Sequence, residues 1–545
     1  MKLIKKIRKL LKSISLYINT IKYMKLDQIL YRILFAIRKV NINKNIEIPN
    51  IRDSSFALKD YIYKNNSTNN GKSFTFLNLN YVFEEKIDWN LSKMPKLWLY
   101  NLHYFDFINS KDLLNDISLS NNLIRHWIYE NKSIRGEGWE PYTLSLRIVN
   151  WIKWSLTYKK LNEEELASLF QQTFFLSKNI EYHIYGNHLI ANAKALMFAG
   201  IFFNEHKNNN FKTLGEELFN SQIKEQILED GAHFELSPMY HQIIFEDILD
   251  IINIYQAFEE TIPQKWIDIA KAMQKWARAM SHPDQGIAFF NDAAHKIAPS
   301  LSDIESYAAR LGLEFNEDDF KIRNLKQSGY VIYNSEDAKL IFDCGQIGPD
   351  YIPGHGHADL FSIELSIFRK RLIVNGGTST YEISKKRDFE RSSAAHSTVE
   401  IDGKNSSEVW SSFRVARRAY PKNVIIDNSN DEINISALND SFRGYLNERI
   451  LKIKKNSLKI QDSIEGKFKN AISRLILHPE VYARKVNDKL IILRFLNEKE
   501  EIRVTSDTAL NIGKTSYSPE FGKTIETNYI YCRFIEDKLK VNISW

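Results

Sequence analysis

The sequence predicts a multidomain α+β protein in which a helical domain precedes a β domain. Residues 111–312 place apolar side chains at helical spacing, and after residue 326 the spacing shortens to the alternation typical of strands. Helices followed by a long series of strands indicate an all-α domain joined to an all-β domain. The chain has 545 residues, 43% of them hydrophobic, which is enough for two cores.

The first 95 residues are predicted to be a basic helical extension and a linker. Residues 1–50 hold 12 Lys and Arg against 2 Asp and Glu, with apolar residues at helical spacing. Such a helix fits an anionic membrane surface, and it fits equally well a helix packed on the body with a solvated basic face. No nucleic acid partner is expected, because no binding motif accompanies the charge. The polar stretch 65–71 is expected to be an exposed loop.

The sequence gives little sign of a membrane span or an export signal. No run approaches the roughly 18 apolar residues of a membrane span, and residues 13–21 are short and interrupted by polar residues. We expect a cytoplasmic protein or one at the inner face of the membrane, with a periplasmic location left open. Two cysteines, Cys344 and Cys532, do not form a disulfide framework.

The helical domain is expected over residues 96–320. Its clearest amphipathic segments are residues 144–156, 163–176, 188–203 and 240–258. The β domain is expected over residues 326–545. Its clearest strands are residues 330–333, 339–343, 360–368, 371–374, 472–478 and 489–495.

Two polar clusters open predicted helices. Asn187 precedes His188 at the N-cap position of one helix, and capping alone would account for this asparagine. In the second cluster Pro238 can start a helix, which puts the phenol of Tyr240 beside the imidazole of His241 on its first turn. Neighbouring acid and base groups of this kind suit proton transfer.

The segment Gly354–Asp359 concentrates the chemistry of the predicted β domain. His355, His357 and Asp359 alternate along it, so they share one face if the segment is a strand. Two imidazoles and a carboxylate on one face suit a proton-transfer or metal site better than a core.

These motifs, together with the segment Arg391–Gly403, resemble those of the heparinase II/III-like polysaccharide lyases, a family that includes heparin and alginate lyases. The resemblance extends from about Trp98 to Phe413, and the motifs follow the family's order and approximate spacing. It implies that the helical domain is an incomplete α/α toroid and that the β domain is an antiparallel β-sandwich.

The resemblance also implies a catalytic set. A lyase removes the proton on C5 of a uronic acid, next to a carboxylate whose charge must be neutralised. Asn187 and His188 correspond to the neutralising groups, and Tyr240 and His355 to the acid and the base. Which of the two is the base depends on the epimer at C5, and a tyrosine base needs a lowered pKa.

One divalent metal, zinc in a structural role, is a further implication of the resemblance. Its ligands would be His357, Asn375 and His396, with Asn375 in the place of the usual aspartate. A neutral amide oxygen binds zinc more weakly than a carboxylate. The alternative is a metal-free site in which both histidines hydrogen-bond to Asn375.

Several residues are candidates for contact with an acidic sugar. Trp139 could stack on a sugar ring and Arg147 could pair with a uronate or sulfate, although both could equally be internal packing groups. The other candidates are Glu235, His241, Arg387 and Arg391.

The expected function is cleavage of a uronate-containing polysaccharide or oligosaccharide by β-elimination, in capsule or O-antigen metabolism. Two alternatives remain at this stage. One is a glycan-binding protein of a polysaccharide biosynthesis system that lacks turnover. The other is a glycan hydrolase or transferase, in which Glu235 would face Glu246 or Asp359 across the sugar.

Overall fold

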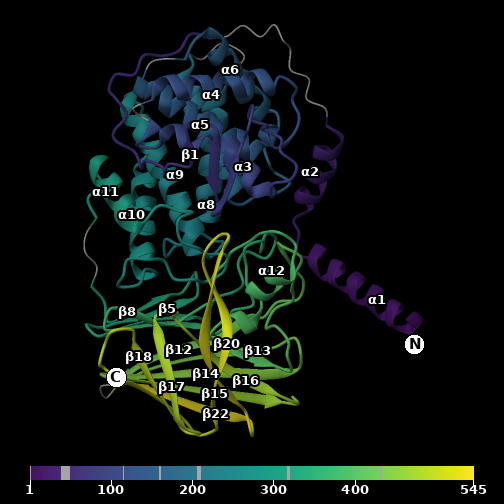
Figure 1. Cartoon of the computed structure of the whole chain (residues 1–545), viewed down its shortest axis with the longest axis vertical. Helices are drawn as coiled ribbons and strands as arrows, with labels where there is room; N and C mark the ends of the chain where they lie inside the picture. The colour runs from purple at the N-terminus through teal and green to yellow at the C-terminus, as the bar shows by residue number, and fades with distance from the viewer. Residues whose placement is uncertain are drawn as a thin grey trace.

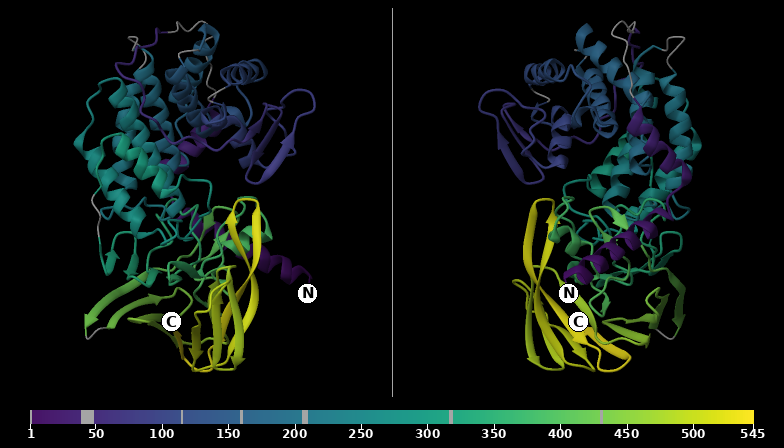
Figure 2. Two further views of the ribbon diagram at one scale, coloured as in Figure 1. Left: turned by 60° about the vertical axis from the view of Figure 1, so that its left-hand side comes forward. Right: turned by 90° about the vertical axis from the view of Figure 1, so that its right-hand side faces the viewer.

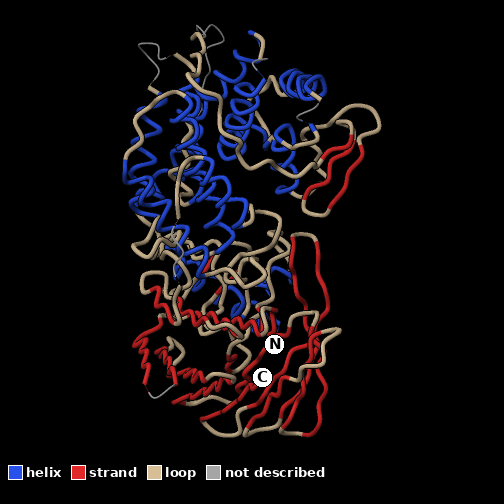
Figure 3. The backbone as a smooth tube through the Cα atoms, turned by 90° about the vertical axis from the view of Figure 1, so that its left-hand side faces the viewer, coloured by secondary structure: helices blue, strands red, loops and turns tan. Residues whose placement is uncertain are grey.

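The computed structural model describes residues 2–38, 49–113, 116–158, 161–204, 210–315, 319–429 and 432–545. A helical half lies above a half made of antiparallel sheets (Figure 1), and the same division is visible by secondary structure (Figure 3). The predicted order of a helical domain and a β domain is confirmed. Each of the strands and amphipathic helices singled out above overlaps an observed element of the same type.

The helical half is built around one helix that is buried on all sides. The helices are α3 (Lys96–Tyr104), α4 (Ile117–Glu130), α5 (Pro141–Tyr158), α6 (Glu163–Ser177), α7 (Asn187–Phe202), α8 (Phe211–Gln226), α9 (Pro238–Ala257), α10 (Gln264–Ala279) and α11 (Leu301–Arg310). Every residue of α7 except His188 is buried. A helix with apolar side chains on every face is stable in water only if neighbouring elements cover every face. Here α5, α6, α8 and α9 pack around α7.

The first 95 residues contain more structure than a helical extension and a linker. Helices α1 (Lys2–Ile21) and α2 (Leu26–Ile37) are followed by a small antiparallel sheet of β1 (Thr68–Asn69), β2 (Ser73–Phe76) and β3 (Leu79–Val82). The prediction missed this sheet because its strands are only two to four residues long. The expected loop 65–71 is wrong in part, since Thr68 is a buried strand residue.

Two large antiparallel sheets form most of the β half. The larger has the order β20-β21-β16-β8-β7-β6-β5-β4, with β9 beside β16. Its strands are β4 (Ile322–Leu325), β5 (Tyr330–Asn334), β6 (Ala338–Asp343), β7 (Ile363–Ile367), β8 (Lys370–Val374), β9 (Val399–Ile401), β16 (Ala471–Leu477), β20 (Leu510–Glu520) and β21 (Lys523–Arg533).

The second sheet has the order β12-β13-β14-β15-β22-β19-β18-β17. Its strands are β12 (Pro421–Ser429), β13 (Glu432–Asp440), β14 (Tyr445–Lys454), β15 (Ser457–Gly466), β17 (Val481–Asn487), β18 (Leu490–Phe495), β19 (Ile502–Ser506) and β22 (Lys538–Ser544). Strand β13 alternates buried and part-buried residues. Its inward side chains share one apolar core with those of the larger sheet, as expected for two sheets packed face to face.

Two hairpin tips connect the halves. The β2–β3 turn holds Leu77 and Asn78 at φ 55° and 60°, the left-handed pair of a type I′ turn. The Asn78 side-chain amide donates to the Phe521 carbonyl at 2.8 Å and to Glu520 Oε2 at 3.1 Å in the β20–β21 turn. Figure 2 shows the β20–β21 hairpin rising toward the small sheet. At Gly522 any side chain would clash, because a Cβ would lie 2.1 Å from the Leu77 carbonyl oxygen.

Within the described part of the chain, no helix combines the length and the apolar character needed to cross a bilayer.

A buried arginine, Arg449, forms an ion pair within the second sheet, links that sheet to the larger one and generates a stability prediction. Arg449 on β14 donates from Nε and Nη2 to the carboxylate of its cross-strand partner Asp462 at 2.7 and 2.9 Å, and from Nη1 to the Phe361 carbonyl. Arg449→Ala should lower the free energy of unfolding by about 3–5 kcal/mol, because a buried carboxylate loses its partner. Urea unfolding measures this loss.

The matched control is Arg494→Ala, which breaks the exposed pair of Arg494 with Glu501. Exposed pairs contribute less than about 1 kcal/mol. Equal effects of the two substitutions would contradict the prediction.

Candidate active site

A cleft of about 1610 Å³ runs between the helical half and the β half. Asn187, His188, Tyr240 and His355, the four expected catalytic residues, all line it. They come from the first turns of α7 and α9 and from the loop between β6 and β7. The structure therefore brings together side chains that are up to 168 positions apart in the sequence.

Asn187 is the first residue of α7 and does not cap it. Gly186 occupies the cap position at φ 63°, and no side chain caps this helix, so the N-cap assignment of Asn187 is wrong. The Asn187 amide points instead at Glu235, with Nδ2 3.3 Å from Oε2, and its backbone N–H donates to Oε1 at 3.1 Å. A glycine is needed at position 186 because a Cβ there would lie 2.4 Å from that carboxylate.

His188 is held by a carboxylate that was not predicted. Its Nδ1 lies 3.1 Å from Oε1 of the buried Glu181, and its ring packs on Tyr142 with centroids 4.4 Å apart. Burial, the largest influence, acts against protonation, but the charge of Glu181 outweighs it with help from Glu235 and Glu140, and the pKa of His188 is raised.

Tyr240 and His355 are stacked. Their ring centroids lie 3.9 Å apart at 29°, and the Tyr240 hydroxyl is 3.0 Å from the hydroxyl of Tyr381. Burial, followed by the nearby Tyr381, raises the pKa of Tyr240 well above its usual value. A tyrosine base requires the opposite shift, so this site keeps Tyr240 protonated.

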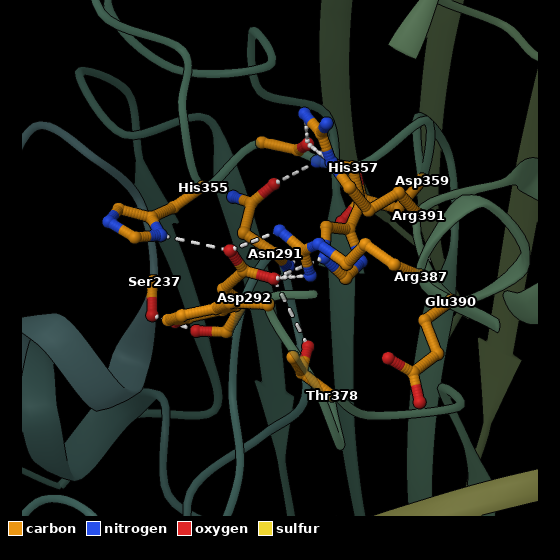
Figure 4. A network of polar contacts seen from close by, with 12 residues as sticks. Ser237, Asn291, Asp292, His355, His357, Asp359, Thr378, Arg387, Glu390 and Arg391 are labelled. Atoms are coloured by element: carbon orange, nitrogen blue, oxygen red, sulfur yellow. Dashed lines mark hydrogen bonds and ion pairs between the residues drawn. The ribbon is translucent and has the colours of Figure 1, made fainter. Parts of the chain in front are cut away.

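Asp292 is the centre of the polar network behind His355 (Figure 4). Its Oδ2 lies 2.9 Å from His355 Nδ1 and accepts a hydrogen bond from Arg387 Nη2 at 2.7 Å. Its Oδ1 lies 2.9 Å from His357 Nε2 and accepts a hydrogen bond from the Thr378 hydroxyl at 3.2 Å. Burial raises the pKa of Asp292, but Arg387 and the two histidines outweigh it and hold that pKa well below the usual range. Asp292 is therefore an anion that orients both imidazoles.

The segment Gly354–Asp359 is a loop, not the predicted strand. His355 and His357 nevertheless turn toward one carboxylate, Asp292, while Asp359 accepts from the Asn291 backbone N–H at 3.1 Å. The sequence signal for Asp292 is weak. The signal consists of two polar residues, Asn291 and Asp292, directly after the apolar run 287–290.

The expected zinc ligands His357, Asn375 and His396 lie close together. His357 Nδ1 and His396 Nε2 are 3.2 Å apart, and the Asn375 amide oxygen already accepts from the Ser397 backbone N–H at 3.0 Å. The metal-free alternative, in which both histidines hydrogen-bond to Asn375, differs from the structure. The two histidines contact each other, His357 contacts Asp292, and His396 contacts the Ser392 carbonyl. Among the residues that the structure describes, no three His, Cys, Asp or Glu are arranged to hold a metal.

Trp139 and Arg147 are internal packing groups, so their assignment to the substrate is wrong. Neither lines the cleft. The fully buried Arg147 donates to the carbonyls of His103 and Gly138 and lies 3.8 Å above the Trp127 ring. Trp139 is 6% exposed and donates to the Asn131 carbonyl.

His241, Arg387 and Arg391 are also buried away from the cleft, which corrects their assignment. His241 Nε2 lies 2.9 Å from the Met273 carbonyl oxygen. Arg387 pairs with Asp292, and Arg391 donates to the carbonyls of Gly356 and Ser412. Of the substrate-contact candidates only Glu235 lines the cleft.

Comparisons with known proteins place both halves in one family. The family model described as "Heparinase II/III N-terminus" matches residues 21–311, and that described as "Heparinase II/III-like, C-terminal" matches residues 318–545. A heparin-sulfate lyase of Bacteroides stercoris is 28% identical over 253 residues, which cover 42% of this chain and 38% of that protein. One of Pedobacter heparinus is 27% identical over 266 residues, covering 44% and 40%. The chain thus spans about two fifths of the length of these relatives.

Solved structures share the fold. The crystal structure of a heparinase III aligns over 95% of this chain and 88% of its own, with a TM-score of 0.70 at 16% identity. A heparan sulfate lyase mutant from Pedobacter heparinus aligns over 87% and 81%, with a TM-score of 0.60 at 16% identity. The first of the family models alone covers more than half of the chain. The chain therefore belongs to the heparinase II/III family.

Proposed function

We propose that this protein is a polysaccharide lyase that cleaves a uronate-containing glycan by β-elimination in the cleft between its halves. One observation carries the proposal. Two groups that can bind a carboxylate, Asn187 and His188, line the same cleft as the stacked pair Tyr240 and His355. Relatives named heparin-sulfate lyase support a lyase activity.

His355 is the proposed base. Asp292 is ionised and faces His355 Nδ1, so it holds the ring proton there and leaves the lone pair of Nε2 for the substrate. Nε2 takes the proton from C5, and the electron pair of that C–H bond forms the C4–C5 double bond. The C4–O bond breaks in the same process.

Tyr240 is the proposed acid. Its raised pKa keeps the hydroxyl proton in place until the departing oxygen on C4 needs it. Tyr381, 3.0 Å away, can return a proton to Tyr240 after each turnover. Because Tyr240 and His355 are stacked, they approach the sugar from one side, which favours uronates whose C5–H and C4–O bonds lie on the same face, as in glucuronate.

Asn187 and His188 neutralise the uronate carboxylate in this scheme. The raised pKa of His188 favours the charged imidazolium, and the Asn187 amide adds a neutral donor. Glu235 is an acceptor for the Asn187 amide, so we assign it to orienting that amide and not to holding an acidic sugar.

The wider context also belongs to this proposal. We infer an incomplete α/α toroid for the helical half, a place in capsule or O-antigen metabolism, and a contact of α1 with an anionic membrane surface. Side chains of α1 including Leu10, Leu11 and Ile18 are about 60% exposed, and its sequence has no acidic residue.

The hydrolase alternative finds no support in the cleft. Glu246 forms an ion pair with Lys64 at 2.7 Å, and Asp359 does not line the cleft. These contacts do not support the hydrolase alternative, in which Glu235 and one of these carboxylates would face each other across the sugar.

Tyr240→Phe should lower kcat for β-elimination by about 10²–10⁴-fold, because the leaving oxygen loses its proton donor. The measurement is the ultraviolet absorbance of the conjugated C4–C5 double bond during incubation with heparan sulfate, hyaluronan and alginate. Tyr63→Phe, a change of another cleft-lining tyrosine, is the control and should keep full activity.

Shortened chains without an absorbance rise would replace elimination by hydrolysis. Binding without cleavage of any polymer, the producing strain's own capsule included, would replace it by the glycan-binding alternative.

Glu181→Gln should shift the alkaline limb of the kcat/KM profile to lower pH. The carboxylate raises the pKa of His188, so its removal lets the imidazolium lose its proton at a lower pH and weakens uronate binding there. Glu382→Gln, which alters another carboxylate of the cleft, is the control. An alkaline limb that moves equally in both variants would contradict a specific role of Glu181.

A further inference from the structure

The N-terminal arm, defined as α1 and α2, forms part of the cleft wall. Its side chains line the same cleft as the proposed catalytic residues, although they lie some 150 or more positions earlier in the sequence. The cleft-lining residues of the arm include Tyr17, Thr20, Gln28 and Arg32. In Figure 2, α1 lies beside the sheet half and α2 lies beside the helical half.

Specific contacts fix the arm to both halves. On α2, the buried Gln28 donates to the Tyr351 carbonyl at 3.3 Å, and Asp27 accepts from the Tyr185 hydroxyl. On α1, Thr20 accepts from the indole N–H of Trp410 at 3.1 Å. Cleft-facing side chains of the arm are therefore held in place by both halves of the protein.

Two arginines of the cleft have no carboxylate partner among the described residues. They are Arg32 of the arm and Arg414 of β11 (Arg414–Val415), which pairs with β10 (Val409–Trp410). Every other Lys and Arg that lines the cleft has such a partner, as in Lys64–Glu246, Lys96–Glu140, Lys153–Asp250, Lys194–Asp247, Lys296–Glu520 and Arg418–Asp350.

Arg32 and Arg414 also lie near each other. Partial burial, followed by the charge of Arg414, lowers the pKa of Arg32. The Arg414 guanidinium donates to the Tyr17 hydroxyl at 3.3 Å and lies 4.9 Å from the centre of the Trp410 ring. Two cationic side chains without carboxylate partners in one cleft create a positive potential that an anion relieves.

Arg414 is next to the proposed reaction centre. Phe413 precedes Arg414, lines the cleft and is 43% exposed. Its ring lies 5.8 Å from that of His355 and 5.1 Å from that of Tyr381, centroid to centroid. An exposed aromatic ring thus lies between the acid–base pair and Arg414 and offers a face for a sugar.

We infer that Arg32 and Arg414 form an anion subsite that binds a carboxylate or sulfate of a sugar adjacent to the one cleaved. Guanidinium groups bind both anions through paired N–H donors. The inference rests on the proposed function, since it takes the cleft to be the glycan site. It makes the N-terminal arm part of the substrate site.

The first test is kinetic. Arg32→Ala and Arg414→Ala should each raise KM about tenfold, with a smaller change in kcat, and added salt should reduce the difference from the wild type. Lysine at either position should restore only part of the affinity, because its ammonium group lacks the paired N–H donors of a guanidinium group. Arg38→Ala is the matched control, since Arg38 directly follows α2 as its C-cap residue but does not line the cleft.

The second test measures binding without turnover. In a Tyr240→Phe background, calorimetry with a heparan sulfate hexasaccharide compares the double Arg32→Ala, Arg414→Ala variant with its parent. Weaker binding of this probe but unchanged binding of its desulfated form identifies sulfate as the ligand group, whereas weaker binding of both identifies a carboxylate. Circular dichroism melting confirms that each variant is folded.

The lyase proposal and the subsite proposal can be contradicted independently of each other. Absence of a wild-type absorbance rise contradicts the lyase activity, and the calorimetric comparison still tests the subsite. The subsite is overturned if the two single variants, Arg38→Ala and the wild type have equal KM and the double variant binds the hexasaccharide as tightly as its parent. A parent that does not bind the hexasaccharide overturns it too.

Discussion

The site depends on the burial of one carboxylate, Asp292, in contact with its cationic and polar partners. An unpaired charge inside a protein is strongly destabilising, so a buried carboxylate persists only where its surroundings supply donors. Here they come from three segments: the 353–359 loop, the segment around Thr378, and α12 (Lys385–Glu390), which carries Arg387. Satisfying Asp292 therefore fixes the loop that presents His355, and the position of the proposed base follows from the stability of the fold.

Sequence periodicity was sufficient for the architecture, because amphipathic helices such as α5 and α9 and strands such as β16 repeat their apolar residues over many positions. It failed where a short element depends on tertiary contacts. The strands β1–β3 are too short to show a period, and the 353–359 loop alternates like a strand although its conformation comes from Asp292, more than 60 positions earlier.

Residue type was a poor guide to substrate contacts. Arg147 and Arg391 carry charge, yet both are satisfied by backbone carbonyls in the interior, and only the tertiary structure reveals such acceptors. The four catalytic candidates came from a family resemblance and reach one cleft. Glu181, Asp292 and Tyr381 orient or adjust them and were not predicted, because single acidic or aromatic residues in connecting segments have little local signature.

The contact between the β2–β3 and β20–β21 tips has a consequence for how a polymer reaches the bond to be cleaved. Leu77, Asn78, Glu520 and Phe521 all border the cleft, so the bridged tips close it on that side. On the proposed function, a long polysaccharide enters from that side only while the Asn78 hydrogen bonds are broken, whereas a free chain end can enter along the cleft with the two tips joined.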